Sequence, residues 1–161
     1  MTESAVARPG DRYLLAGAEL ITFILRGQEY SLLENATHAG YAGPPPHRHL
    51  RQDEGFYVLE GEFTFHTDGQ TIKASAGQFA NVRKGSTHTF QNTGAGVGRM
   101  LAFVAPAGDF ERFIEEAGEP VTMATPPIPP MEPPDATVLY RLLSAAKRHH
   151  LEILLPPERQ P

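Results

Sequence analysis

The chain has 161 residues, which is enough for one domain with an appendage and too few for two full-sized enzyme domains. Its 14 Lys and Arg against 19 Asp and Glu give a net charge of −5, so no basic surplus is available to neutralise a nucleic-acid backbone, and we expect no nucleic-acid partner. The chain contains no Cys, which excludes disulfides, thiolate nucleophiles, Fe–S clusters and Cys-ligated zinc, so any metal must be held by histidines and carboxylates.

The N-terminal segment, MTESAVARPGDRY, lacks the basic-then-apolar order of a signal peptide. The chain also has no apolar run of about 18 residues, the length that a membrane-spanning helix needs. We therefore expect a cytoplasmic protein with no membrane partner.

Up to about residue 107, the sequence predicts short β-strands separated by turn residues. The predicted strands are Glu19–Leu25, Glu29–Ala36, Phe56–Glu60, Glu62–Thr67, Thr71–Ala74, Phe79–Val82, Thr87–Asn92 and Val97–Val104. Asp68-Gly69, between two of these runs, is a strong hairpin signal. Short strands at regular spacing, with no helix among them, are typical of an all-β sandwich or barrel.

A short amphipathic helix follows the strands, in the segment DFERFIEEAG. Apolar residues recur there at helical spacing, and we expect Asp109 to cap the start and Gly118 to end the helix. We expect this helix to close a first domain that covers residues 1–118.

The prolines divide the rest of the chain into a linker and a tail. Seven of them lie between Pro120 and Pro134, which predicts an extended linker over residues 119–134. In residues 135–161 we expect a C-terminal helix, capped by Asp135, and a tail that packs on the barrel or on a partner subunit. The predicted apolar stripe of this helix is Leu139, Leu142, Leu143 and Ala146.

The most informative stretch is PPPHRHLRQDEGFYVLEGE. His47 and His49 are two residues apart, so an extended strand points both imidazoles to one face, where each can offer a nitrogen to one metal ion. Glu54 is at an odd offset and joins them only if a turn or bulge intervenes at Leu50–Asp53. His88, after a turn with glycine and at the start of a strand, can supply a fourth ligand.

These stretches resemble the two sequence motifs of the cupin superfamily. The first motif is matched by His47, His49, Glu54 and Gly61, and the second by Gly77, Gly85, His88 and Asn92. The resemblance covers roughly residues 40–104. Two positions depart from the family pattern, since Tyr41 and Arg83 stand where the family has glycine and proline. Neither departure touches a ligand position.

The resemblance implies a small cupin β-barrel of jelly-roll type with a helical C-terminal appendage, and a metal bound by His47, His49, Glu54 and His88. Three imidazoles and a carboxylate suit a divalent transition metal such as Fe, Mn, Co, Ni or Zn. Four protein ligands on a metal that prefers six leave positions for water, dioxygen or substrate.

The site is similar to that of quercetinase-like single-domain dioxygenases, which implies an oxygenase acting on a small enol or hydroxy-ketone of flavonol, aromatic or polyketide type. Glu54 is then a catalytic base as well as a ligand, or a ligand alone. Two alternatives stay open. One is a non-redox isomerase, cyclase or decarboxylase at the same metal, and the other is a non-catalytic cupin that binds a small molecule.

Strand parity adds two expectations. Phe56 and Val58, with Phe90 beside His88, face inward and are candidates for a substrate pocket, although core packing explains them equally well. Tyr57 and Leu59 face outward, which predicts that the tail or a second subunit covers them, and we expect a homodimer.

Two further polar residues receive structural interpretations. Asn92 is expected to hold a strand end by hydrogen bonds, and His66 is expected to be exposed beside the Asp68-Gly69 turn.

Overall fold

The computed structural model describes residues 10–157, so the outer ends of the predicted first and last segments, 1–9 and 158–161, lie outside the described part. The larger sheet contains β1 (Arg12–Leu15), β2 (Glu19–Arg26), β3 (Ser31–Thr37), β5 (Asp53–Glu60), β8 (Phe79–Val82), β10 (Gly98–Ala105) and β11 (Glu119–Val121). The smaller sheet contains β4 (His47–His49), β6 (Glu62–Thr67), β7 (Gln70–Ser75), β9 (His88–Asn92) and β12 (Leu151–Ile153). The helices are α1 (Asp109–Ala117) and α2 (Ala136–Arg148).

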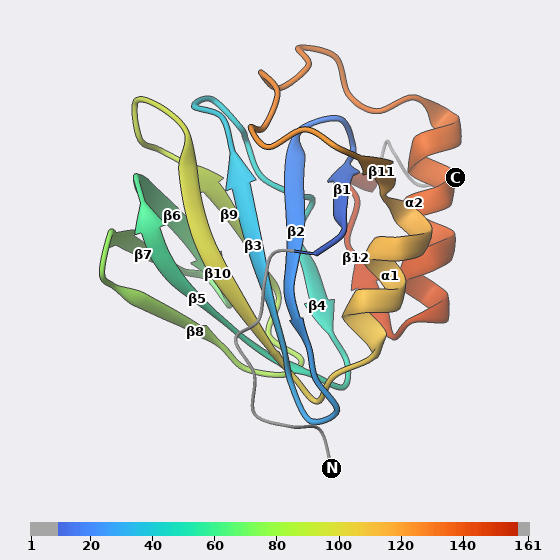
Figure 1. Cartoon of the computed structure of the whole chain (residues 1–161). Helices are drawn as coiled ribbons and strands as arrows, with labels where there is room; N and C mark the ends of the chain where they lie inside the picture. Colours follow the sequence, from blue (N-terminus) through green and yellow to red (C-terminus); the bar gives the residue numbers. More distant parts are fainter. Residues whose placement is uncertain (1–9, 158–161) are drawn as a thin grey trace.

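The two sheets face each other across one core, and the two helices stand together on one side (Figure 1). The strand order is β11-β1-β2-β3-β10-β5-β8 in the larger sheet and β12-β4-β9-β6-β7 in the smaller. Fully or nearly fully buried aromatic residues fill the space between them, namely Phe56, Phe63, Phe65 and Phe90. Burying one such side chain contributes about 1.5–3 kcal/mol, so these rings are a main source of barrel stability. The predicted all-β barrel with a helical C-terminal part is confirmed.

All eight predicted strands are present, with ends shifted by a few residues. The largest shift is in β5, which starts at Asp53 instead of Phe56 because Asp53 to Tyr57 pair with β10 on one side and largely with β8 on the other. The hairpin between β6 and β7 is confirmed, and both of its turn residues have positive φ, 46° at Asp68 and 79° at Gly69. The sequence did not predict β1, β11 and β12, which are short and depend on distant partners.

Helix α1 is confirmed, but the prediction that Asp109 caps it is wrong. Gly108 holds the cap position, and the Glu111 carboxylate accepts a hydrogen bond from the Gly108 N–H at 2.8 Å. Glu111 thus satisfies the N–H of the cap residue, and Asp109 is the first residue of the helix, where its negative charge is favourable. The predicted end at Gly118 is confirmed, and an added Cβ there would lie 2.7 Å from the Ile114 carbonyl oxygen.

The segment predicted as a linker begins with a strand. Glu119–Val121 forms β11 and pairs with β1 at the edge of the larger sheet, where a residue such as Pro120 is tolerated. Helix α2 follows, and the predicted cap is confirmed because the Asp135 carboxylate accepts from the Val138 N–H at 2.9 Å. Of its predicted stripe, Leu142 and Ala146 are buried, whereas Leu139 and Leu143 are half-buried.

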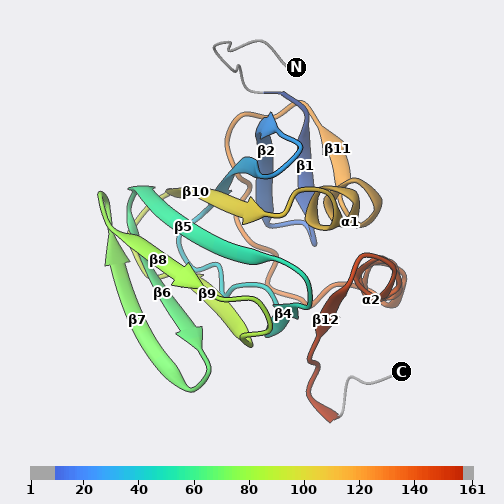
Figure 2. The same ribbon diagram turned by 90° about the horizontal axis from the view of Figure 1, so that it is seen from below.

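The tail returns to the barrel of its own chain, where β12 lies beside β4 (Figures 1 and 2). It does not reach the outer face of the larger sheet. Tyr57 and Leu59 are 43% and 42% exposed. The prediction that the tail covers them is therefore wrong, and cover by a second subunit stays a prediction.

Candidate metal centre

Three strands bring the four predicted ligands together. His47 and His49 lie on β4 and His88 begins β9, both in the smaller sheet, whereas Glu54 lies on β5 in the larger sheet. The chain bends at Leu50 and Arg51 and crosses from one sheet to the other. Glu54 therefore meets the histidines across the barrel interior, which resolves its odd offset from His49.

The ligand atoms of His47, His49, Glu54 and His88 all lie within 4.8 Å of one another. One carboxylate oxygen, Glu54 Oε2, is 3.0 Å from His88 Nε2 and 3.2 Å from His49 Nε2. Glu54, His49 and His88 are each at most 4% exposed, and His47 is half-buried. Such a cluster offers nitrogen and oxygen donors from several directions to one point, as a metal ion requires.

Backbone carbonyls orient two of the imidazoles. His47 Nδ1 is 3.0 Å from the carbonyl oxygen of Pro45, and His88 Nδ1 is 3.1 Å from that of Ser86. A carbonyl only accepts hydrogen bonds, so each Nδ1 carries the proton and donates it. The lone pair of His47 Nε2 is thereby available to a metal, since a backbone carbonyl at Nδ1 is the usual second contact of metal-binding histidines. His88 Nε2 lies 3.0 Å from Glu54 Oε2 and donates to it in the metal-free protein, so it must release that proton when a metal binds.

His49 gives the clearest sign that a ligand belongs here. It is 2% exposed, yet neither of its ring nitrogens makes a hydrogen bond. Its ring packs against Phe110 of α1 in an edge-on contact with centroids 5.0 Å apart. Leaving a buried polar atom unpaired costs about 1–3 kcal/mol, and a metal bound at Nε2 would remove part of that cost. The residues present therefore fit a divalent transition metal.

The electrostatics of the cluster favour an anionic carboxylate. Burial by itself would raise the pKa of Glu54, but the charge of His49, 3.2 Å away, together with the hydrogen bond and charge of His88, outweighs it and holds the pKa well below its ordinary value. Burial also acts to lower the pKa of His88, and here the hydrogen bond and charge of Glu54 prevail and raise it. At His47, burial and the two neighbouring imidazoles lower the pKa to about 3, which keeps that ring neutral.

The predicted pocket residues lie in the core next to the cluster. The Phe56 ring is 6.4 Å from the His88 ring and 5.8 Å from the Phe90 ring, centroid to centroid, and Val58 is fully buried. All three pack into the hydrophobic core. That a substrate contacts them stays a prediction.

Asn92 has the structural role expected of it. Its Nδ2 donates to the carbonyl oxygens of Thr37 and Gly96, both at 3.0 Å, and its Oδ1 accepts from the Gly94 N–H at 3.0 Å. His66, also as expected, is exposed and lies outside the cluster.

The sequence did not reveal a second buried polar cluster, which comprises Glu19, Asn35 and Tyr41. Glu19 Oε1 accepts from Asn35 Nδ2 at 2.5 Å and Oε2 accepts from the Tyr41 hydroxyl at 3.1 Å. Burial raises the pKa of Glu19 to about 7 against the effect of these hydrogen bonds, and the charge of Glu54 adds to the rise. A signal was present, because Tyr41 is one of the two departures from the family motif.

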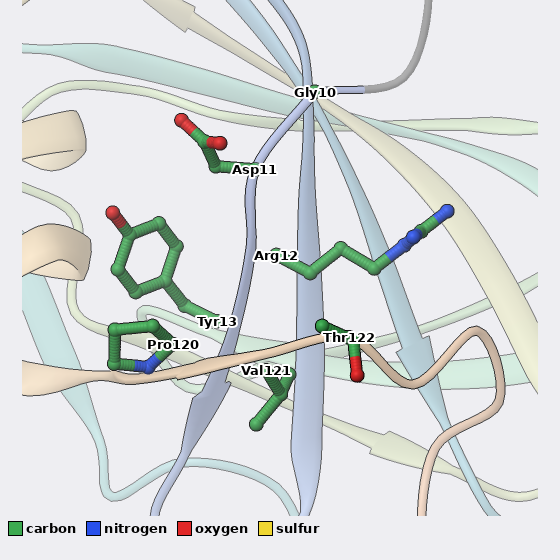
Figure 3. Close-up of a pocket in the computed structure, with 7 residues that line it drawn as sticks. All are labelled: Gly10, Asp11, Arg12, Tyr13, Pro120, Val121 and Thr122. Carbon is green, nitrogen blue, oxygen red and sulfur yellow. The ribbon is translucent and has the colours of Figure 1, made fainter.

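A surface hollow of about 300 Å³ lies elsewhere, at the β1–β11 edge of the larger sheet. Figure 3 shows its lining, with Asp11 and Tyr13 on one side of β1 and Arg12 on the other. It contains none of the predicted site residues, so we do not assign it to the same function.

Comparison with known proteins relates the barrel to one family. Residues 36–104 match the Cupin domain family, in agreement with the cupin motifs of the sequence. The chain is 35% identical over 74 residues to quercetin 2,3-dioxygenase of Bacillus subtilis, a match that covers 46% of this chain and 21% of that protein. It is 35% identical over 48 residues to an oxalate-binding protein of Thermotoga maritima, covering 30% of this chain and 40% of that protein. The chain thus spans less than half the length of either relative.

Solved structures agree on the fold. KdgF from Halomonas sp. superposes with a TM-score of 0.58 at 17% identity, covering 63% of this chain and 91% of that one. A RmlC-like cupin from Shewanella frigidimarina gives a TM-score of 0.54 at 23% identity, covering 62% and 86%. Within residues 10–157, neither helix has the length and apolar character needed to cross a membrane.

Proposed function

We propose that this chain is a metal-dependent dioxygenase that acts on a small enol or hydroxy-ketone of flavonol, aromatic or polyketide type. The observation that carries the proposal is the buried His49, whose two ring nitrogens make no hydrogen bond within a cluster of three imidazoles and one carboxylate. The match to a quercetin dioxygenase over 74 residues supports the choice of reaction.

The bound metal would activate substrate and dioxygen and stabilise negative charge on the substrate oxygen. The chain's own residues would hold and orient the reactants. Glu54 is anionic, so its carboxylate can accept a hydrogen bond from the hydroxyl of an enol that approaches His47. It would act as a base for that proton once a metal engages His49 and His88, whose contacts lower its pKa in the metal-free protein. His47 is the ligand with the most exposure, which makes its side of the cluster the route by which a substrate would enter.

Oxygen uptake tests this proposal directly. Protein reconstituted with Fe, Mn, Co or Ni is mixed with flavonols, β-diketones and catechols, and dioxygen consumption is recorded. We expect consumption with at least one substrate class, loss of it in Glu54→Ala, and retention in His66→Ala, the matched control for a histidine outside the cluster. Uptake that is absent throughout, or equal in Glu54→Ala and wild type, would contradict the proposal.

The second candidate is a non-catalytic protein that binds a small acid, and the match to an oxalate-binding protein favours it. It predicts that dicarboxylates raise the melting temperature of the metal-loaded protein while no dioxygen is consumed. The two candidates are therefore separated by the same set of samples.

We keep the expectation that the protein works in the cytoplasm.

We also propose that the protein forms a homodimer through the outer face of the larger sheet. Tyr57, Leu59, Phe79 and Phe103 are between 38% and 56% exposed there, and the Tyr30 ring stacks on Phe103 with centroids 5.3 Å apart. An apolar patch of this kind is typical of an interface. Light scattering should give twice the monomer mass, and Tyr57→Glu should give a monomer, whereas Tyr140→Glu on the exposed face of α2 should not.

A further inference from the structure

The strand that carries two of the four candidate ligands pairs at more positions with the tail than with its neighbour in the barrel. Strand β4 pairs with its barrel neighbour β9 at a single position, His47 opposite His88. It pairs with β12 at three positions, and two of these place Leu151 opposite His49 and Ile153 opposite His47. Without β12, β4 would be the edge of the smaller sheet.

Backbone hydrogen bonds fasten β12 at both ends of β4. The Leu50 N–H donates to the His150 carbonyl oxygen at 2.9 Å, and the Leu154 N–H donates to the Pro46 carbonyl oxygen at 2.8 Å. The second bond fixes the residue directly before His47. The segment before His47 consists of Pro44, Pro45 and Pro46, and proline has no backbone N–H. Backbone hydrogen bonds can therefore hold this segment only through its carbonyl oxygens.

A side-chain pair holds the middle of the same two strands. Arg48 lies between the two histidines, and its Nε and Nη2 are 2.7 and 2.6 Å from Glu152 Oε2. The two side chains are 39% and 42% exposed, so the pair contributes little to stability by itself. It does fix the register of β12 on β4.

The other end of the tail is anchored on α1, which also touches the metal cluster. Glu116 of α1 accepts hydrogen bonds from Arg148 and from His149, the latter at 2.7 Å, at the end of α2. Phe110 of the same helix packs against the His49 ring. The tail and α1 therefore enclose His49, with buried Leu151 opposite it in the sheet.

We propose that β12 is a positioning strand of the metal centre, so that His47 and His49 reach a metal with the correct geometry only while the C-terminal tail is docked on β4. This inference rests on the proposed metal site. It assigns Glu152 and the Leu154 N–H as positioning groups, since neither touches the metal.

The test uses full-length variants. Leu154→Pro removes the N–H that bonds Pro46, and proline there restricts Ile153 to the extended backbone that it already has. Glu152→Arg places a cation beside Arg48, and the double variant with Arg48→Glu restores the pair in reverse. Glu132→Arg makes the same charge change at an exposed position of the linker and is the matched control. For each protein we measure Co(II) affinity by chelator competition, the Co(II) absorption spectrum, and the melting temperature without metal.

We expect Leu154→Pro to weaken Co(II) binding by about 10- to 100-fold, the usual effect of losing a group that orients a metal ligand, and to change the spectrum. Glu152→Arg should weaken binding less, and the double variant should recover it, while Glu132→Arg matches wild type. If the tail only stabilises the fold, the variants will have a lower melting temperature but unchanged Co(II) affinity and spectrum. That result would overturn this inference and leave the proposed metal site standing. If wild-type protein binds no Co(II), the metal site itself fails and the inference fails with it. If Leu154→Pro does not fold, Glu152→Arg and the double variant with Arg48→Glu test the inference by the same measurements.

Discussion

The barrel encloses two glutamates that are equally buried, since Glu19 and Glu54 are each 4% exposed. Their pKa values nevertheless move in opposite directions. Glu19 has the neutral groups of Asn35 and Tyr41 as hydrogen-bond partners, and burial raises its pKa to about 7. At Glu54 the imidazoles of His49 and His88 outweigh burial and lower the pKa. Burial alone therefore does not decide the charge of an interior carboxylate, and its partners do.

This difference separates a metal cluster (His47, His49, Glu54 and His88) from a carboxyl cluster (Glu19, Asn35 and Tyr41). Both oxygens of Glu19 accept a hydrogen bond from within the carboxyl cluster, and the one buried atom of this cluster without a hydrogen bond, Asn35 Oδ1, is an amide oxygen. In the metal cluster, His49 has no hydrogen bond at all. Only the metal cluster combines an anionic oxygen with unpaired nitrogen donors, which is the combination that binds a cation.

The largest expected effect is on metal binding. Glu54→Gln keeps the shape of the side chain but removes the charge, and we expect it to lower Co(II) affinity by more than about 100-fold, beyond the range seen for residues that only orient a ligand. Glu19→Gln makes the same change in the carboxyl cluster and should leave affinity unchanged. Isothermal titration at one pH compares the two. Equal losses would show that the clusters act as one site.

The next effect concerns stability against pH in the metal-free protein. The pKa of Glu19 is about 7 in the folded chain and 4.5 ordinarily, so the folded state holds a proton that the unfolded state has lost between these pH values. The stability that comes from this group is complete below pH 4.5 and is lost as the pH rises through 7, by about 3 kcal/mol in total. Glu19→Gln cannot titrate and should not show this loss.

Urea unfolding of wild type and Glu19→Gln between about pH 4.5 and 8 measures it. Since His47, Glu54 and His88 titrate in both proteins, the difference between the two curves reports on Glu19. We expect the free energy of unfolding of wild type to fall relative to the variant as the pH rises. A difference that is constant with pH would contradict the assignment.

A smaller effect should follow from Tyr41→Phe. The variant keeps the ring that packs near Phe90 and removes the hydroxyl that donates to Glu19. Leaving Glu19 Oε2 without this donor should lower the free energy of unfolding by about 1–3 kcal/mol. Co(II) affinity should not change, and a parallel loss of affinity would instead place Tyr41 in the metal centre.

The sequence predicted that His47, His49, Glu54 and His88 lie together, because its signals for this cluster are local. His47 and His49 share one strand, and Glu54 and His88 stand at fixed spacing within two motifs, so their arrangement follows from short segments once the barrel is assumed. The odd offset of Glu54 was explained only by the fold, since the chain changes sheets after His49. The spacing of His49 and Glu54 predicts a bend between them, but it does not predict that the chain passes from one sheet to the other there.

The carboxyl cluster and the tail strand were missed for the opposite reason. Asn35 lies 16 positions from Glu19, and their hydrogen bond depends on how β2 and β3 pair. Strand β12 has three residues, too few for a periodic pattern, and it is a strand because β4 offers a free edge. The cap of α1 was mispredicted because Asp109 is already the first residue of the helix, and Gly108, with a φ of 123°, holds the cap position.

The central claim is that the metal cluster binds one divalent transition metal per chain. Co(II) titration of the metal-free protein, followed by its absorption spectrum, tests this most directly when wild type, His49→Ala and His66→Ala are compared. The account predicts one equivalent bound in wild type and in His66→Ala, with binding lost in His49→Ala. It would be contradicted if wild type bound no Co(II), or if His49→Ala bound it as tightly as wild type.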